Sequence, residues 1–519
     1  MATPSSVPPS GKGDPSGKEG RRFFQTPYVW AFTTYFAEGF PYTVIRIISS
    51  VFFRDMRVSL EAIGLTSLFG LPWVLKFLWG PQVDRYATKR RWMLIMQALL
   101  VAMVILAAFF AGAPAGVSLI AGLFFVGAFV AATHDIAIDG YYMEALDRKG
   151  QAKFVGYRVM AYRIAMMTGT GVIITIGARI DWTTGFLCAG LLLALLFTYH
   201  ILFLPRVETE KAPFGELIKG FLRVRPVLTL LALAALTTAG WWVFSLPWYG
   251  SLKSTFPVLK KIRFAGWVGI GLLLALILLT LFKERIKGLF LRDRDSFYSR
   301  AFLAYMDREK MGAALAFIIL MRTGESMLAS MASPFMVDLG IKVHYGWISG
   351  GIGLPFSILG AMIGGWMISR YSLRKTLWPF LLAQNLTNLV YMGLALYLAP
   401  YVRINTGAEH VLFIGNFNLF LVAVVHAFDQ FAGGLGTSVL ATYLMRTCLS
   451  EFKAAHFAIG TGLMNISGVL SGVVSGFLAG WLGYGYFFGI SFVASVPGML
   501  LIFFIPFLDA EGGRANVDA

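Results

Sequence analysis

Apolar stretches of about 20 residues recur along this chain, and that recurrence limits its fold more than any other feature. A helix needs about 20 apolar residues to cross the roughly 30 Å hydrocarbon layer of a bilayer. Of the 519 residues, 57% are hydrophobic and 14% are charged, whereas a soluble domain has about 25% charged residues. The apolar runs are continuous and do not alternate with period two, which excludes a transmembrane β-barrel. The sequence therefore predicts an all-α integral membrane protein.

Fourteen stretches meet this length criterion, and basic residues predict their orientation. Short loops rich in Lys and Arg stay in the cytoplasm, and this rule places both termini there. The segment between the seventh and eighth stretches disagrees, because its four basic residues would be external. The predicted transmembrane helices are 28–50, 61–83, 92–111, 117–144, 153–177, 183–204, 227–248, 264–282, 311–337, 345–369, 377–399, 411–444, 457–480 and 484–507.

The remaining composition argues against several other classes of protein. Residues 1–27 are rich in Ser, Pro and Gly and are predicted to be a disordered cytoplasmic tail, followed at the other end by a second tail, 508–519. The net charge of +17 lies in loops and not on one soluble face, so no nucleic-acid partner is expected. Cys188 and Cys448 lack Cys or His neighbours at ligand spacing, and no metal or cofactor is expected. His134 and Asp139 have a spacing used by some lipid acyltransferases, but residues five apart on a helix point about 140° away from each other, so no enzyme is predicted.

Two loops repeat one pattern, which indicates an internal duplication. Residues 80–90 read GPQVDRYATKR and residues 365–375 read GWMISRYSLRK, with Gly, Arg-Tyr and a basic pair at identical offsets. The alternative interpretation is a pair of solvated turns that only set topology. Duplication predicts two six-helix halves, 28–204 and 311–507, with helices 227–248 and 264–282 inserted in a central cytoplasmic linker, 205–310. Duplicated halves around a midplane site are typical of secondary transporters.

Charged residues inside the predicted spans need partners or functions, because each costs about 2.5 to 3.5 kcal/mol at the bilayer centre. Counting 1.5 Å per residue from the cytoplasmic ends of the fourth and fifth helices predicts two ion pairs, Asp135 with Arg163 and Asp139 with Arg158. These pairs could serve only to hold the two helices together. The full set is Glu38, Arg46, Lys76, Asp135, Asp139, Glu144, Arg158, Arg163, Arg322, Glu325, His426 and Asp429.

Three of these acids are candidates for proton coupling. Glu38 lies near the midplane beside Gly39 and Pro41, where a helix can bend. Such a carboxylate could take up a proton, or it could pair with Lys76. Glu325 and Asp429 are candidates on the same grounds. The five glycines between 460 and 476 predict a close helix-packing face.

Several segments resemble the AmpG-type muropeptide permeases, a branch of the major facilitator superfamily that is related to acetyl-coenzyme A transporters. The chain departs from that branch in carrying its extra helix pair between the halves, and in having Glu325 where Asp is commoner. The segments that carry the resemblance are FAEGFPY (36–42), KFLWGPQVDRY (76–86), ATHDIAIDGYYMEAL (132–146), YRIAMMTG (162–169), TGESMLASMASPFMVDLGI (323–341) and DQFAGGLGTSVLATYLMRTC (429–448).

The resemblance implies a fold, a gate and an activity. The fold would be that of the superfamily, with a central cavity lined by the first, fourth, seventh and tenth core helices. Gly80, Asp84 and Arg85 would form a cytoplasmic gate, with Arg370 as the counterpart in the second half. The activity would be proton-coupled import of N-acetylglucosaminyl-1,6-anhydro-N-acetylmuramyl peptides across the bacterial cytoplasmic membrane, for peptidoglycan recycling, by a monomer.

The expected substrate contacts follow from that substrate's carboxylates and sugar rings. Aromatic residues near a membrane interface are more often belt residues, which is the alternative for the Trp and Tyr candidates. Two rival functions remain: transport of acetyl-coenzyme A or another anionic metabolite, and non-transporting sensing of muropeptides. The candidates are Arg46, Lys76, Arg163 and Arg322 for carboxylates, Tyr42, Trp73, Trp79 and Tyr141 for sugars, and Asp135 and Asp139 as further contacts.

Overall fold

In the described part of the computed structural model, all regular secondary structure is helical, apart from one isolated bridge between Tyr86 and Ala212. Within that part, eight helices are long and apolar enough to cross a bilayer, and a pair bent by 61° would be a ninth. The predicted helices 227–248 and 264–282 lie outside the described residues, except for Trp242 and residues 246–248. The described residues are 23–76, 79–113, 115–207, 212–213, 215–216, 242, 246–255, 297–407, 411–449 and 453–508.

The first group of helices runs from Pro27 to Phe203. Its opening helix contains Pro41 and continues through a π-helical turn, as expected where proline removes a backbone donor. Thr88 and Asp181 cap two later helices by accepting hydrogen bonds from the backbone N–H groups of Arg91 (3.2 Å) and Thr184 (2.7 Å). The elements are α2 (Pro27–Thr43), η1 (Val44–Ile48), α3 (Ser49–Asp55), α4 (Leu60–Leu65), η2 (Thr66–Gly70), α5 (Leu71–Leu75), α6 (Gly80–Arg85), α7 (Lys89–Phe110), α8 (Gly116–Ala145), α9 (Arg148–Met167), η4 (Thr168–Ile173), α10 (Ile174–Arg179) and α11 (Trp182–Phe203).

The second group begins after the central linker. Its last helix is continuous in hydrogen bonding, but Gly483 interrupts it with a φ of 75°, at the break predicted between residues 480 and 484. A short helix of the linker, α14 (Pro247–Thr255), precedes this group. The elements are α18 (Phe297–Met306), α19 (Met311–Leu320), α20 (Thr323–Asp338), α21 (Lys342–Tyr345), η5 (Gly346–Gly353), α22 (Leu354–Tyr371), α23 (Leu373–Tyr397), α24 (Ala399–Gly407), α25 (Asn416–Arg446), α26 (Lys453–Leu500) and η6 (Leu501–Phe503).

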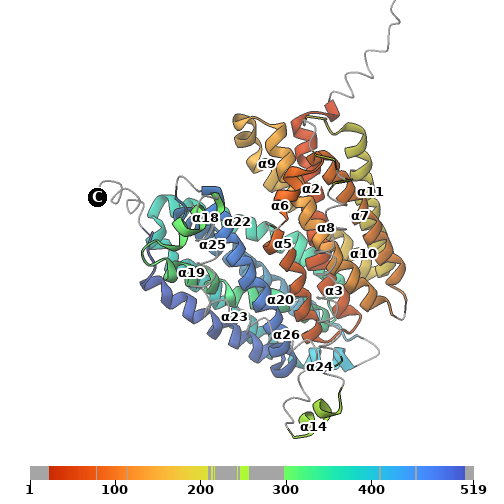
Figure 1. Cartoon of the computed structure of the whole chain (residues 1–519). Coiled ribbons are helices and arrows are strands. Elements are labelled where there is room, and N and C mark those ends of the chain that lie inside the picture. Colours follow the sequence, from red (N-terminus) through yellow and green to blue (C-terminus); the bar gives the residue numbers. More distant parts are fainter. Residues whose placement is uncertain are drawn as a thin grey trace, which may run out of the picture.

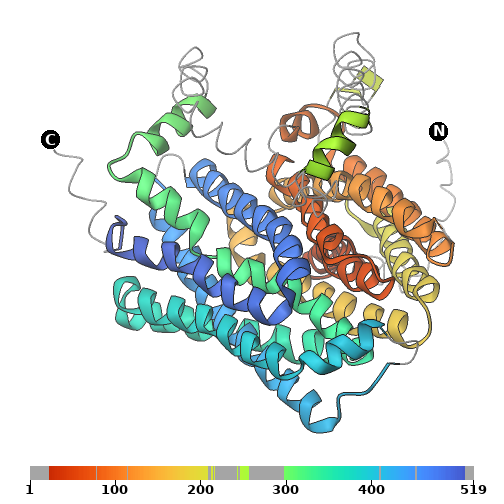
Figure 2. The same cartoon turned by 90° about the horizontal axis from the view of Figure 1, so that it is seen from below.

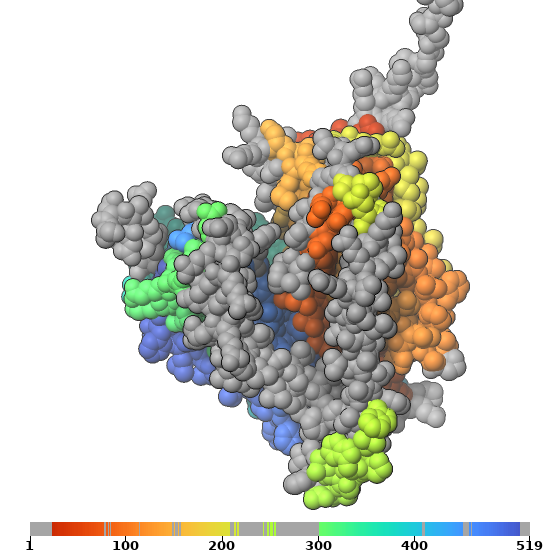
Figure 3. Space-filling view, in the orientation of Figure 1, coloured from red at the N-terminus to blue at the C-terminus, as the bar shows by residue number. Residues whose placement is uncertain are grey.

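The two groups lie side by side and meet at one end (Figures 1 and 2). We call this the closed end; it contains the end of α3 and the beginning of α21. The groups diverge toward the opposite end, where α2 begins (Figures 1 and 3). Helix α14 lies beyond the closed end (Figure 1), although α11, which precedes the linker, ends at the opposite end. The end of α11 and the beginning of α14 therefore lie at opposite ends of the bundle.

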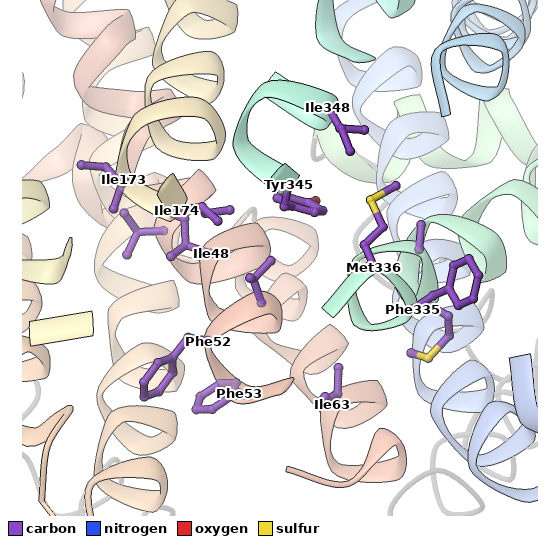
Figure 4. Packing of buried hydrophobic residues seen from close by; sticks show 14 of the residues in the cluster. Ile48, Phe52, Phe53, Ile63, Ile173, Ile174, Phe335, Met336, Tyr345 and Ile348 are labelled. Atoms are coloured by element: carbon purple, nitrogen blue, oxygen red, sulfur yellow. The ribbon is translucent and has the colours of Figure 1, made fainter. Parts of the chain in front are cut away.

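One apolar cluster spans both groups at the closed end. Phe52 and Phe53 of α3 belong to the same buried cluster as Phe335 and Met336 of α20, as Figure 4 shows. Of the five glycines predicted to form a packing face in α26, Gly460, Gly472 and Gly476 pack closely, whereas Gly462 and Gly468 do not. A Cβ atom on Gly476 would lie 2.8 Å from the Cα atom of Gly64 in α4, so these two backbones are in direct contact.

The glycine contact predicts a conformational effect. Gly476→Ala should push α26 away from α4 and weaken the closed end, because the added methyl group overlaps the backbone of α4. The measurement is modification of a cysteine introduced at Ser50, with Cys188 and Cys448 replaced, and we expect at least a several-fold faster reaction.

The control is Gly462→Ala in the same helix, where an added Cβ meets no atom within 4 Å. Alanine is a better helix former than glycine, so this variant should react like the parent protein. Equal reaction rates in the two variants would show that the glycine contact does not hold the closed end together.

Candidate transport cavity and buried charge clusters

A cavity of about 610 Å³ lies between the two groups of helices. Elements of both groups contribute to its walls: η1, η2, α5 and α9 from the first, and α20, η5, α25 and α26 from the second. Ser50 of α3 and Ser333 of α20 line it near the closed end, and their hydroxyl groups are 3.2 Å apart. The cavity is therefore sealed on that side by contacts between the groups.

The charge of this cavity is positive. Among the lining residues that the structure describes, only Arg46 and Arg322 are ionised at neutral pH. Arg322 is bound by Glu325 through two contacts of 2.5 Å. Arg46 instead donates to two backbone carbonyls, those of Thr66 (3.1 Å) and Ser67 (2.8 Å). Arg46 thus brings a positive charge to the cavity that no carboxylate of the described residues neutralises.

The two walls of the cavity differ in chemistry. On the first wall, the ring of Tyr42 meets that of Trp73 edge to face at 5.1 Å and lies 6.2 Å from that of Tyr162. The second wall is rich in hydroxyl groups, with Ser326, Ser330 and Ser333 following one face of α20. Aromatic faces suit sugar rings and the serines can donate or accept hydrogen bonds, so the cavity can hold an anionic, hydroxyl-bearing molecule.

The buried charges of the first group pair differently from part of the prediction. Asp139 accepts from Arg158 at 3.3 Å, as predicted. The predicted pair of Asp135 with Arg163 is wrong: Asp135 binds Lys76, directly after α5, at 2.5 Å. Arg163 forms no ion pair with another described residue. Depth along two antiparallel helices does not fix which neighbour a side chain faces, and Asp135 faces the residue that follows α5.

Glu38 lies in the same cluster. Its charged neighbours include Asp135, Asp139 and Lys76. Its Oε2 atom is buried and has no hydrogen-bond partner in the described part of the chain. Tyr35 adds a link between the members, since its hydroxyl group donates to Asp139 at 2.7 Å. Glu38 is therefore one of three acids that share a single, partly buried site.

The acids of the second group have different surroundings. Glu325 is held by Arg322 and also accepts from the side-chain amide of Gln384 at 2.6 Å. Asp429 is 5% exposed, and the hydrogen-bonding atoms next to it belong to the neutral side chains of Thr387 and Gln430. His426, one turn before Asp429, contacts the hydroxyl group of Tyr391 instead.

Several predicted substrate contacts lie away from the cavity in this conformation. Tyr141 is fully buried, donates to the carbonyl of Pro205 at 2.8 Å and packs on Trp30. Trp79 donates to Thr133 at 3.1 Å. The ring of Tyr141 lies within a helix contact, and that of Trp79, directly before α6, packs on Phe129 of α8 at 5.8 Å. Lys76, Asp135 and Asp139 are likewise absent from the lining, since their charges are used within the buried cluster. Of the predicted contacts, Arg46, Arg322, Tyr42 and Trp73 line the cavity.

The predicted gate residues lie in the two repeated loops. Arg85 is exposed and stacks on the ring of Tyr86 at 5.4 Å. Arg370 is exposed at the end of α22, and Gly80 begins α6. The side chain of Asp84 lies outside the described part of the structure. A role for this set in gating stays a prediction.

Two ion pairs at the closed end were not predicted. Arg54 at the end of α3 binds Asp338 at the end of α20 through contacts of 2.6 and 2.5 Å. Asp55 accepts from Lys342 at 2.7 Å and from the indole of Trp182, also at 2.7 Å. One signal was available: Arg54 and Asp338 end the first helix of each duplicated half, so the repeat itself brings the two positions together.

The amino-acid sequences of several bacterial proteins are similar to this chain over most of its length. The Anhydromuropeptide permease of Escherichia coli (strain K12) is 24% identical over 90% of this chain and 77% of the permease. The Putative transporter AmpG 4 of Rickettsia conorii is 20% identical, over 90% of this chain and 93% of the relative. These matches confirm the predicted resemblance to the AmpG-type permeases.

Solved structures and a family description agree on the fold. A crystal structure of a POT family transporter in complex with 5-aminolevulinic acid superposes with a TM-score of 0.62 and 16% identity, covering 91% of this chain and 94% of the other. The nucleoside transporter NupG superposes with a TM-score of 0.53 and 12% identity, over 93% and 99% of the two chains. Residues 31–305 match the Major Facilitator Superfamily. The chain is a multi-pass membrane transporter that belongs to the Major Facilitator Superfamily.

Proposed function

We propose that this transporter imports anhydro-muropeptides across the bacterial cytoplasmic membrane, driven by protons. The observation that carries the proposal is the cavity itself: its described charged residues are both arginines, and its walls carry aromatic rings and serine hydroxyls. A 1,6-anhydro-muramyl peptide has carboxylates for Arg46 and sugar rings for the aromatic wall. The resemblance to the Escherichia coli permease supports the same substrate class.

The proposed orientation places both termini and the diverging end in the cytoplasm, with fourteen transmembrane helices. Helix α14 lies beyond the closed end, whereas the end of α11 before it and helix α18 after it lie toward the opposite end (Figure 1). This arrangement supports a linker that crosses the membrane twice. The conformation would then be closed to the outside and open to the cytoplasm. Transport would proceed by alternating access, with the halves moving around the substrate.

Proton coupling would use the acid cluster of the first half. Glu38, Asp135 and Asp139 are three carboxylates, and Lys76 and Arg158 are the cations paired within the cluster. A buried oxygen without a donor, such as Oε2 of Glu38, is costly when charged. The three carboxylates and two cations leave one excess negative charge, which one bound proton would neutralise. Glu38 is the acid best placed to carry that proton.

The substrate assignment is tested by uptake into proteoliposomes. We expect labelled anhydro-muropeptide to accumulate only with an inward proton gradient, and Arg46→Gln to raise the KM at least tenfold. The reason is that a hydrogen bond between charged groups is worth about 1.5 to 3 kcal/mol. The matched control is Arg91→Gln, an exposed arginine at the start of α7, which should leave the KM unchanged.

Two results would contradict this assignment. Transport of acetyl-coenzyme A in place of the muropeptide would favour the rival carrier function. Saturable binding of the muropeptide without any flux would favour a sensor.

The coupling role is tested by Glu38→Gln. Glutamine cannot carry the proton, so accumulation against a gradient should be lost, whereas exchange of labelled for unlabelled substrate should continue. Exchange requires binding and movement of the halves but no net proton release. Glu309→Gln, at an exposed position before α19, is the control. Normal accumulation by the Glu38 variant would move the coupling site to another acid.

A further inference from the structure

Around Asp429, a single side-chain hydrogen faces two acceptor oxygens. The hydroxyl oxygen of Thr387 lies 2.8 Å from Oδ1 of Asp429 and 2.7 Å from the backbone carbonyl oxygen of Gln384. Both distances are those of full O–H···O hydrogen bonds. A threonine hydroxyl group has a single hydrogen and a carbonyl can only accept, so with an ionised Asp429 this one hydrogen would have to be shared between two acceptors.

A proton on the Asp429 carboxyl group would give each of these two contacts its own hydrogen. Thr387 then donates to the carbonyl of Gln384, as helical threonines commonly do one turn back, and the Asp429 carboxyl group donates to the Thr387 oxygen. We propose that Asp429 is a proton-binding site in the second half of the transporter, and that it is occupied in this conformation. The proposal deepens the proposed function, because it adds a second titratable site to the one at Glu38.

The charges around Asp429 support a neutral carboxyl group. The titratable groups that interact electrostatically with Asp429 are Glu325 of α20 and Tyr391 of α23, and His426 lies one turn before it on α25. Arg322 is committed to Glu325 by two contacts, and the Nδ1 atom of His426 is engaged by Tyr391 at 2.8 Å. None of these groups provides a counter-ion, and an unpaired charge buried in a bilayer is expensive.

Gln430 connects this site to the cavity. Its side-chain amide donates to Oδ2 of Asp429 at 3.2 Å, and Gln430 itself lines the cavity. Release would transfer the Asp429 proton to water in the cavity and leave a carboxylate. The O–H of Thr387 could then rotate from the Gln384 carbonyl to Oδ1, so the same two oxygens stay in contact in both protonation states.

The arrangement explains why asparagine should be tolerated at this position. Its amide can donate to the Thr387 oxygen in place of the carboxyl proton, so Asp429→Asn should fold and exchange substrate. It cannot release a proton. The number of protons moved per substrate should therefore fall from the parent value, and gradient-driven accumulation should drop at least severalfold.

Infrared spectroscopy of the purified full-length protein at pH 7 tests the proton directly. We expect a carbonyl band of a protonated aspartic acid that disappears in Asp429→Asn and moves to higher frequency in Thr387→Val, which removes the hydroxyl group. Thr387→Ser keeps the hydroxyl group and should keep the band. The control is Asp181→Asn, at an exposed position where asparagine can still cap α11, and it should leave the spectrum unchanged.

Either the infrared spectrum or the measured ratio of protons to substrate can overturn the proposal. A parent spectrum that does not change on Asp429→Asn would show that Asp429 is ionised. An Asp429→Asn protein with the parent ratio of protons to substrate would show that its proton is not transported. If the parent protein fails to carry anhydro-muropeptide, the proposed substrate is wrong, but the infrared comparison still decides whether Asp429 holds a proton.

Discussion

The ion pair between Arg54 and Asp338 joins the two halves of the molecule, and the shape of the cavity depends on it. Both oxygens of Asp338 are used by Arg54, and Tyr484 donates to one of them at 2.6 Å. The side chains are 14% and 6% exposed. Removing one partner of such a pair leaves an uncompensated charge and typically costs about 3 to 5 kcal/mol. Loss of either partner would therefore destabilise the arrangement in which the halves meet at the closed end.

Three of the other cations inside the bundle are paired within their own half, whereas Arg46 is not. Lys76, Arg158 and Arg322 each contact a carboxylate of their own half. Arg46 is held by backbone carbonyls and keeps its charge available to a ligand. Binding and stability thus use different residues, which allows a substrate to enter the cavity without breaking the ion pairs that hold each half together.

Hydropathy and spacing predicted most of the fold, because the length of a span and the position of a break are local properties. The break at Gly483 is an example of such a local property. The pair of Asp139 with Arg158 was predicted as well, because the two helices that carry it are joined by a short loop. The sequence could not show which side of a helix meets which neighbour. For that reason Asp135 was given the wrong partner, and Tyr141 was expected in a cavity that it does not line.

Only some residues of the cavity and of the closed end could be predicted from the sequence. Arg46 and Arg322 were recognised because charge inside an apolar run is unusual, and both line the cavity. The pairs at the closed end were missed because Arg54, Asp55 and Lys342 lie at helix ends, where charged residues are common and carry little signal. The proton assigned to Asp429 depends on two interatomic distances that no sequence pattern contains.

The central claim is that the closed end opens as the opposite end closes, and pairs of spin labels can measure both. One pair would replace Met56 and Trp347 at the closed end, and the other Met143 and Met445 at the ends of α8 and α25, all of which are exposed. On addition of anhydro-muropeptide to proteoliposomes, a population with a longer first distance and a shorter second distance is expected. Distances that stay constant, or that change in the same direction, would contradict alternating access around this cavity.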